Sequence, residues 1–469
     1  MEFLKKKVEK QGTNIILKLQ ELFNVEKINK KGEELGFVER KSKINTYNFM
    51  MSNLLALDVN GGGCSLSDIN NELSDNFGIL SKNQSINERF NEKSVALSKW
   101  MLESVISKRL VDFNSVKCVN KFSSIEIQDA TGISLPEVLS NQFKGYGGDG
   151  SAAGLKIDLR MDLLSTDFHF RIKQATDNDQ NGLTFGVQKN SLWIRDLGYF
   201  KYEDFKTINK QGGYFLSRLQ NGSNVYLDNK RRSSAKLDLI DLISQLSDNQ
   251  SVDQWFYLGY EKRWPVRVVI NKLPKQEAER RKKRIIKYKK NKGKKYTKSL
   301  LKLLELNVFI TNIPKKMCSG EEILELYTIR WQIEILFKSW KTNYEIDDLK
   351  INIKGDRALT QFYLHLALII ITTSVFRFLK LENWKENKKE LSEIKGMKII
   401  KKWAGELLRI LASKSKEKRR LLKLQIRQMF RQVINNGTKN SSKKNISKLF
   451  HPKILNLSLI HISEPTRPY

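Results

Sequence analysis

The sequence predicts a mixed α/β fold, with a central sheet, a β-rich insertion, and helical regions at both ends. Two observations predict it. Between residues 120 and 305, polar and apolar side chains alternate over short stretches, as they do in β-strands. Before and after this part, apolar residues recur every three or four positions, as they do in amphipathic helices. The 469 residues give enough length for two to four domains with buried cores.

Residues 1–115 are predicted to form a separate helical N-terminal region. Apolar residues such as Ile15, Leu19 and Leu22 have helical spacing, and the glycines at 61–63 interrupt the pattern as a loop.

A helix-turn-helix is one interpretation of part of this region. It would consist of a short helix near residues 67–73, a turn around Gly78, and a second helix from about Ser81. The second helix would then present side chains able to pair with base edges in a DNA groove. These side chains are Gln84, Asn87 and Arg89. Ordinary helix packing is the alternative interpretation.

The central part is expected to contain five strands and a helix. The strands are predicted at residues 122–127, 155–163, 168–173, 192–195 and 214–218, and the helix at residues 200–210. Three successive strands, followed by two that a helix separates, are typical of a mixed sheet. Asp129 comes just after the first predicted strand, and Asp196 closes the fourth.

Residues 219–305 interrupt this pattern and are interpreted as an insertion. Strand-like pieces lie at residues 225–227, 255–260 and 266–270, followed by a dense basic run at residues 279–295. A charge run is often only a solvated face. However, so many like charges repel one another, and we expect this run to contact a phosphate backbone.

The last third is predicted to be helical and basic. A long helix is expected over residues 321–341, and a helical region over residues 346–450. The apolar run at residues 362–376 is too short for a membrane span and is interpreted as a buried core helix. Residues 451–469 resemble translated read-through, so this tail of doubtful origin is excluded from the reasoning about the fold.

The charge balance indicates a polyanionic partner. The chain has 84 lysine and arginine residues against 51 aspartate and glutamate residues, a net charge of +33. No basic amphipathic anchor is evident, which favours nucleic acid over a membrane. The N-terminus has no secretory signal, and the three cysteines suit a reducing compartment, so we expect a cytoplasmic protein.

Four side chains in the predicted helix at 321–341 would share one face. Tyr327, Arg330, Glu334 and Lys341 are separated by three, four and seven residues, which confines them to an arc of roughly 60°. Such a helix would present a phenol, a guanidinium, a carboxylate and an ammonium in a line.

A single carboxylate among cations suggests phosphoryl chemistry if other carboxylates join it. Two-metal catalysis needs several carboxylates that converge on two ions. Asp129 and Asp196, each expected at a strand end, are candidates to join Glu334. Without metal the three charges would repel one another, so we expect bound divalent cations, with Mg²⁺ as the physiological ion. Asp149, Asp158 and Asp162 lack the flanking pattern and are not expected to be ligands.

At these residues the chain resembles bacterial insertion-sequence transposases of the DDE class, which have a ribonuclease-H-like catalytic domain. The family signature Tyr-x2-Arg-x3-Glu-x6-Lys is present from Tyr327 to Lys341. The first aspartate region corresponds to Gln128-Asp129-Ala130-Thr131, and the second to Asp196-Leu197-Gly198-Tyr199-Phe200. The resemblance covers residues 120–345, which would form the catalytic domain with the insertion at about 219–305.

The resemblance implies site residues and a reaction. Asp129, Asp196 and Glu334 would be catalytic and hold two Mg²⁺ ions, with Mn²⁺ as a substitute. The side chains expected to contact DNA are Tyr327, Arg330, Trp331, Lys338 and Lys341, with Trp331 near a base flipped out during hairpin formation.

The implied function is cut-and-paste transposition: cleavage at the element ends, passage through a hairpin, and strand transfer into target DNA. The partners would be double-stranded DNA and a second copy of the chain, with no membrane, in the bacterial cytoplasm and at the nucleoid when bound. The alternative is a catalytically inactive or truncated DNA-binding protein descended from such an enzyme.

Overall fold

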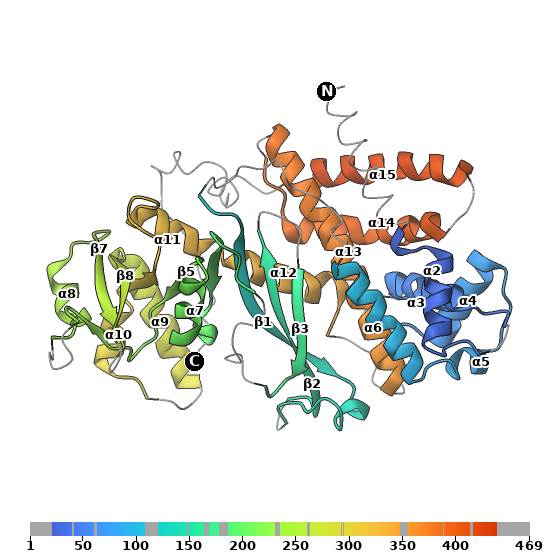
Figure 1. Ribbon diagram of the computed structural model, residues 1–469, viewed down its shortest axis with the longest axis horizontal. Coiled ribbons are helices and arrows are strands. Elements are labelled where there is room, and N and C mark those ends of the chain that lie inside the picture. The colour runs from blue at the N-terminus through green and yellow to red at the C-terminus, as the bar shows by residue number, and fades with distance from the viewer. Residues whose placement is uncertain are drawn as a thin grey trace. The chain divides into compact units, whose positions relative to one another are not determined.

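A computed structural model describes most of the chain between residues 21 and 438 (Figure 1). The gaps within this range are residues 40–41, 61–62, 108–120, 148–149, 164–167, 178–185, 230–234, 260–262, 292, 294, 348–354, 388 and 413–415. Ile15, Leu19, Asp149 and the tail at 451–469 therefore lie outside the described residues.

The chain divides into two compact units that interleave along the sequence. The first comprises Met1–Val116, Asp129–Asn178 and Gln332–Ile446, and the second comprises Lys117–Gln128, Asp179–Trp331 and Ser447–Tyr469. The chain thus passes between the units directly before Asp129 and directly after Trp331. Four consecutive domains were expected from the sequence, at residues 1–115, 120–345, 346–450 and 451–469. They remain a prediction, because the two units are defined by contacts and each combines separate stretches of the chain.

Eight helices make up most of the described part of the first unit. They are α2 (Val25–Glu34), α3 (Thr46–Asn60), α4 (Leu66–Phe77), α5 (Asn83–Asn87), α6 (Glu92–Ser107), α13 (Gly355–Asn387), α14 (Glu393–Ala412) and α15 (Lys416–Asn436). Helix α13 packs against α3, α6 and α14. Its segment Gly355–Lys380 is the one described helix apolar and long enough to cross a membrane, and it is buried inside the protein. The predicted buried core helix is confirmed.

The region interpreted as a helix-turn-helix has one good helix and one very short one. Ser65 and Asp68 form a capping box at the start of α4, and Gly78 ends it at a positive φ of 66°. However, α5 has only five residues. Arg89 lies beyond it and donates a hydrogen bond to Ser42 Oγ at 2.6 Å.

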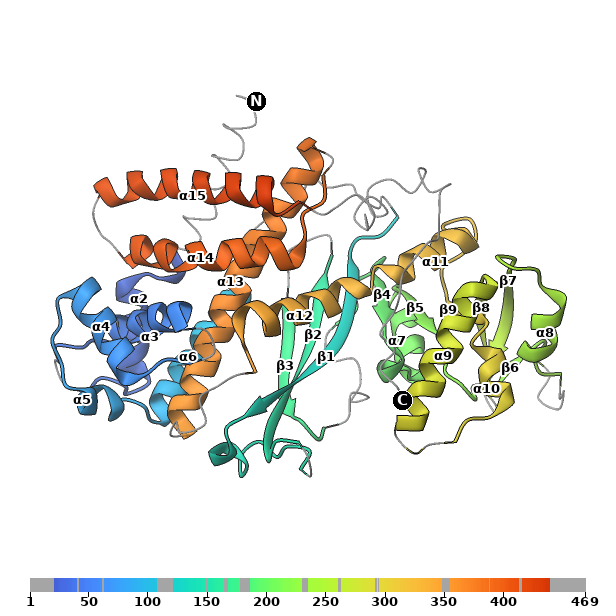
Figure 2. The same cartoon turned by 180° about the vertical axis from the view of Figure 1, so that it is seen from behind.

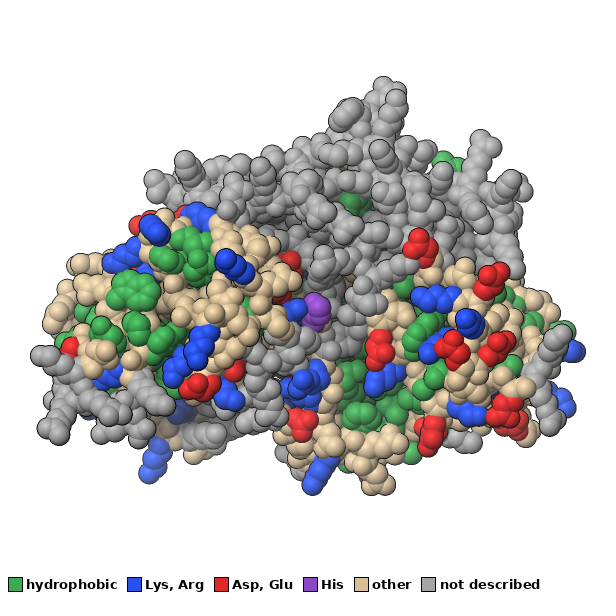
Figure 3. All heavy atoms as spheres, in the orientation of Figure 1, with side chains coloured by type: hydrophobic (Ala, Val, Ile, Leu, Met, Phe, Trp, Pro, Cys, Tyr) green, Lys and Arg blue, Asp and Glu red, His purple; other side chains and the backbone are tan. Residues whose placement is uncertain are grey.

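Placing Arg89 on a groove-facing helix is therefore wrong, because the chain leaves the helix after Asn87. Over the N-terminal helices visible in Figure 3, acidic and basic side chains are mixed.

The first unit also contains part of the sheet. The second half of β1 (Ile125–Leu135) neighbours β2 (Ala153–Asp162), which pairs antiparallel with β3 (Phe168–Gln174). A short 3-10 helix, η1 (Glu137–Leu139), follows β1. The predicted strands at 155–163 and 168–173 are confirmed. The first strand runs eight residues beyond its predicted end, so Asp129 lies inside a strand and not after one.

The second unit contains the rest of the sheet. The first half of β1 begins the strand order β1-β4-β5-β9-β8-β7-β6. Strands β1, β4 and β5 are parallel, and the later pairs are antiparallel. The strands are β4 (Leu192–Arg195), β5 (Tyr214–Arg218), β6 (Val225–Tyr226), β7 (Ser251–Leu258), β8 (Trp264–Lys272) and β9 (Leu306–Thr311). The helices are η2 (Leu197–Tyr199), α7 (Tyr202–Lys210), α8 (Leu239–Gln245), α9 (Lys275–Asn291), α10 (Lys298–Leu303) and α11 (Gly320–Thr328).

The insertion extends the sheet of the second unit. Its three predicted strands are present as β6, β7 and β8, and they join β5 through β9. A buried apolar cluster that includes Phe205, Phe215, Val268 and Ile310 unites the strands before, within and after the insertion. The mixed α/β fold class is confirmed and is consistent with a ribonuclease-H-like fold.

The single helix expected at residues 321–341 is wrong. Helix α11 ends at Thr328, and α12 (Trp331–Tyr344) begins after a turn. The backbone N–H groups of Ile329 and Arg330 donate to carbonyls three residues back, at 3.1 Å each, which tightens the chain into a 3-10-type turn. Tyr327 and Arg330 therefore do not share one continuous helix face with Glu334 and Lys341.

Candidate active site

Asp129 is held in the interior of strand β1. Its side chain is only 4% exposed. One carboxylate oxygen accepts a hydrogen bond from the backbone N–H of Ala130 at 2.8 Å. A buried carboxylate is costly unless cations or hydrogen-bond donors surround it, so this position suits a group that works beside a cation.

Asp196 directly follows strand β4 and precedes η2. In the parallel register of β1 and β4, Gln128 is the partner of Arg195. The residue after Gln128 is Asp129, and the residue after Arg195 is Asp196. Each residue of the Gln128–Arg195 pair is therefore followed directly in the sequence by one of the two aspartates.

Arg330 lies at the turn between α11 and α12 and reaches Asp196. Its guanidinium nitrogen is 3.6 Å from the Asp196 carboxylate, and the two side chains are 9% and 19% exposed. The structure thus brings Arg330, a predicted DNA contact, to a predicted catalytic aspartate.

Tyr327 is buried rather than displayed. Its ring packs on Phe309 of β9, with the ring centres 4.7 Å apart. The guanidinium groups of Arg218 and Arg330 lie 5.5 and 5.6 Å from the centre of the ring. A buried aromatic ring flanked by two guanidinium groups can hold both by cation–π attraction.

Glu334 and the two lysines belong to α12, within the first unit. Glu334 lies in the first turn and is half-buried, and Lys338 is exposed. Lys341 donates a hydrogen bond to the backbone oxygen of Gly132 in β1 at 2.7 Å and forms an ion pair with Asp347 at 3.4 Å. Trp331 begins α12, but its side chain lies outside the described ones.

The predicted metal ligands are divided between the units. Asp129 and Glu334 belong to the first, and Asp196 belongs to the second. Over the described ranges, no three His, Cys, Asp or Glu side chains gather as a metal site. The shared metal role of the three carboxylates therefore remains a prediction. Asp158, which was not expected to be a ligand, forms a buried ion pair with Lys173 at 3.2 Å.

A buried ion pair next to Asp196 was not predicted from the sequence. Arg195 donates a hydrogen bond to Asp204 of α7 at 2.7 Å, and both side chains are almost fully buried. The Arg195 guanidinium also lies 5.2 Å from the centre of the Tyr199 ring. The pair ties the end of β4 to α7. The only signal in the sequence was an arginine inside an otherwise apolar strand.

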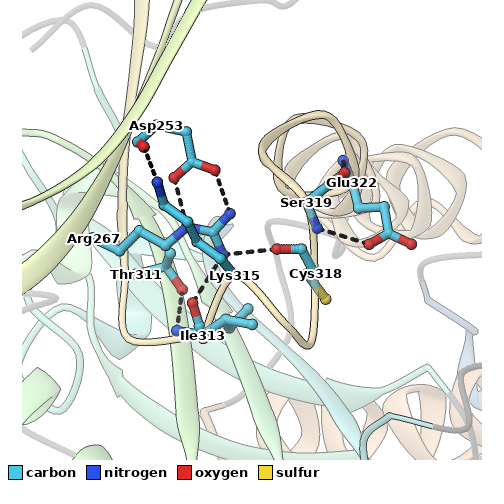
Figure 4. A network of polar contacts seen from close by, with 8 residues as sticks. All are labelled: Asp253, Arg267, Thr311, Ile313, Lys315, Cys318, Ser319 and Glu322. Atoms are coloured by element: carbon cyan, nitrogen blue, oxygen red, sulfur yellow. Dashed lines mark hydrogen bonds and ion pairs between the residues drawn. The ribbon is translucent and has the colours of Figure 1, made fainter.

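A second missed network fixes the segment that leads into α11 (Figure 4). Arg267 of β8 is fully buried and forms two hydrogen bonds to Asp253 of β7, both at 2.7 Å. Its third nitrogen donates to the backbone oxygens of Ile313 and Cys318 at 2.9 and 2.8 Å.

Helix α11 begins directly after this network. Ser319 caps it in a capping box with Glu322. Burial raises the pKa of Glu322, but hydrogen bonds from Lys121 and from the Ser319 backbone outweigh this and lower it. Burial also raises the pKa of the Cys318 thiol to about 11, so this thiol is not a nucleophile near neutral pH.

Comparison with known proteins identifies the family. A family model described as a transposase DDE domain matches residues 120–371, which include all three predicted carboxylates. The chain is 30% identical over 420 residues to the transposase for insertion sequence element IS231F of Bacillus thuringiensis subsp. israelensis, covering 84% of this chain and 86% of that protein. It is 27% identical over 399 residues to the transposase for IS1151 of Clostridium perfringens, covering 80% and 83%. The chain belongs to the DDE transposases of bacterial insertion sequences.

Proposed function

We propose that this protein cuts DNA at the ends of its own insertion sequence and joins the freed ends to target DNA. Family membership and relatives named as insertion-sequence transposases support a DNA substrate. The observation that carries the proposal is the β1–β4 register. In this register Gln128 pairs with Arg195, and each of these two residues is followed directly in the sequence by one of the proposed catalytic aspartates, Asp129 or Asp196.

Asp129, Asp196 and Glu334 are the proposed ligands of two Mg²⁺ ions, for which Mn²⁺ would substitute. Three carboxylates form the hard oxygen donor set that Mg²⁺ prefers, and the burial of Asp129 favours a neighbouring cation. When bound, two such ions would activate the attacking water or hydroxyl and stabilise the charge on the leaving oxygen.

The cationic side chains of the signature would hold and orient the DNA. Arg330 would orient Asp196 through their ion pair and contact a phosphate, and Lys338 and Lys341 would contact phosphates of the element end. The burial of Tyr327 favours a positioning role, in which its ring holds the guanidinium of Arg330. Trp331 is proposed to stack on a flipped base.

The reaction is proposed to run in four steps. Water hydrolyses one strand at the element end and leaves a 3′-hydroxyl. That hydroxyl attacks the opposite strand and forms a hairpin, a second water opens the hairpin, and the new 3′-hydroxyl attacks target DNA. Both element ends must be held together, so a homodimer on DNA is part of the proposal.

A cleavage assay on a labelled duplex that carries the element end tests this function. Glu334→Gln keeps the size of the side chain but removes its charge. We expect at least about a thousandfold loss of cleavage, with end binding in a gel-shift assay retained within about threefold. Glu321→Gln is the matched control, because Glu321 is an exposed glutamate of α11, and it should cut like the wild type.

Two outcomes would contradict the proposal in different ways. Cleavage by Glu334→Gln at the wild-type rate would refute the site assignment. A wild-type protein that binds the ends but never cuts them would instead support the alternative, a catalytically inactive DNA-binding protein.

A further inference from the structure

Helix α9, within the insertion, has two chemically different faces. Its 17 residues carry nine basic and two acidic side chains, a net charge of +7. One side packs on the second unit through the buried Ala278. Figure 2 shows the helix near β9 of that unit.

The cations on the packed side have partners within the protein. Lys282 forms ion pairs with Glu279 and Glu305, both at 2.8 Å. The hydrogen bonds of these ion pairs raise the pKa of Lys282. Arg281 donates a hydrogen bond to the Asn307 side chain of β9 at 2.9 Å. These two side chains anchor the helix to the chain around β9, so their charges serve the fold.

Three lysines on the opposite side form a different group, which we call the α9 stripe: Lys283, Lys287 and Lys290. All three are exposed, and none forms an ion pair with another described residue. At about 100° per residue they lie within an arc of about 60°, roughly 150° around the helix from Ala278. Arg280 extends the same side by one turn and is also exposed.

Like charges repel one another along the α9 stripe, although the charge of Glu279 also attracts Lys283. Lys283 and Lys287 are four residues apart, and Lys287 and Lys290 are three apart, so like charges face each other along the helix. Each such pair destabilises a helix by about 0.2–0.5 kcal/mol. These exposed lysines repel one another, whereas the neighbouring Arg281 and Lys282 have partners within the protein. Such an arrangement is typical of a surface that binds a polyanion.

The dimensions of the stripe match a nucleic-acid backbone. Seven residues at 1.5 Å per residue give a length of about 10 Å, which corresponds to the rise of about three nucleotides of one strand along the duplex axis, at 3.4 Å each. Ala278 is buried and Ile285 and Ile286 are half-buried, so the helix does not offer the broad exposed apolar face that an interfacial membrane helix needs.

We infer that the α9 stripe is a sequence-independent contact surface for the phosphate backbone of double-stranded DNA. The inference rests on the proposed function for its substrate class, and it adds a site remote in sequence from the catalytic carboxylates. Because contacts to phosphates carry no sequence information, element ends and unrelated duplexes should depend on the stripe equally.

The test measures binding to an unrelated 30-base-pair duplex by fluorescence anisotropy over a series of salt concentrations. The full-length variant K283Q/K287Q/K290Q should lower the slope of log affinity against log salt by about 2.7, or about 0.9 for each lost contact. At 0.1 M salt this corresponds to a loss of about two to three orders of magnitude in affinity. The charge-retaining variant K283R/K287R/K290R should bind like the wild type.

A matched control removes three exposed lysines of the same unit that lie outside α9. The variant K189Q/K210Q/K236Q has the same net charge as the test variant, and its salt slope should stay within about one unit of the wild-type slope. An equal effect of both triple variants would overturn the inference, since net charge alone would then explain binding.

Other results separate the inference from the proposed function. If the wild type cuts element ends while the stripe variant keeps the wild-type salt slope, only the inference is overturned. If the stripe variant loses binding to phosphatidylserine vesicles but not to duplex, the surface serves a membrane and the inference is also overturned. A wild type that binds no DNA would refute both.

Discussion

Replacing Arg267 with methionine should destabilise the second unit strongly, because it removes the centre of a buried network. Arg267 is fully buried, whereas the side chain of its partner Asp253 is 23% exposed. The substitution removes two charged hydrogen bonds and leaves the carbonyls of Ile313 and Cys318 without this donor. Breaking a buried ion pair from one side costs about 3–5 kcal/mol. Water can partly resolvate Asp253, so we expect about 3–4 kcal/mol.

The loss should be measured by native-state hydrogen exchange of the amides in β7, β8 and residues 313–319. The free energy of opening of these amides should fall by the amount given above, while α13 in the other unit keeps its protection. Lys206→Met, which breaks an exposed ion pair with Glu203 on α7, is the control and should cost less than about 1 kcal/mol.

A double-mutant cycle separates the ion pair from simple packing. In Arg267→Met combined with Asp253→Leu, no charge is left unpaired at the site. The double variant should therefore be about 1–3 kcal/mol more stable than the sum of the single losses predicts. A loss below about 1 kcal/mol for Arg267→Met, with unchanged exchange at residues 313–319, would refute the claim that this network holds the start of α11.

Two further predictions concern the helical core of the first unit. Burial, together with the charge of Lys401, lowers the pKa of His365 from 6.5 to about 3, so the folded protein binds fewer protons than the unfolded chain between these values. The contribution of His365 to the free energy of unfolding should be fully present above about pH 6.5 and should fall as the pH drops toward 3. Between pH 7 and pH 5 the free energy of unfolding should decrease by about 2 kcal/mol through this group. His365→Leu should flatten this part of the unfolding free energy against pH, and an unchanged slope would contradict the assignment. Gly396→Ala in α14 would place a Cβ 2.1 Å from the buried ring of Phe376, and should lower stability by about 1–3 kcal/mol in thermal unfolding. Gly186→Ala, where a Cβ would meet nothing within 4 Å, should change it by less than about 0.5 kcal/mol.

Strands bounded by clear turn signals could be predicted from the sequence. Strands β2, β3, β4 and β5 begin and end within two residues of their predicted bounds, because each is a short apolar or alternating run between polar or glycine-containing segments. Strand β9 was missed. Its sequence, LNVFIT, is mostly apolar without strict alternation, and no glycine or proline marks where it begins, so periodicity alone does not distinguish it from part of a helix.

The candidate site was predictable as a set of residue types, but not as an arrangement. The motif spacing identified Asp196 and Arg330, and the structure brings them within 3.6 Å of each other. The burial of Tyr327 could not be foreseen, because its neighbours Phe309 and Arg218 come from strands distant in the sequence. Spacing along a helix reports only neighbours on that helix.

The break between α11 and α12 shows why that spacing was misleading. The segment has no glycine or proline at the turn, and one continuous helix was therefore expected, although Thr328 and Ile329 are β-branched and favour a helix only weakly. The chain nevertheless turns at Ile329 and Arg330, where the guanidinium of Arg330 meets Asp196 and the ring of Tyr327. A buried cation needs such partners more than the backbone needs two further i→i−4 hydrogen bonds. The tertiary contacts of the signature residues therefore determine the local backbone conformation. The spacing of the motif gives the separation of these residues along the chain and does not show that they share one helix face.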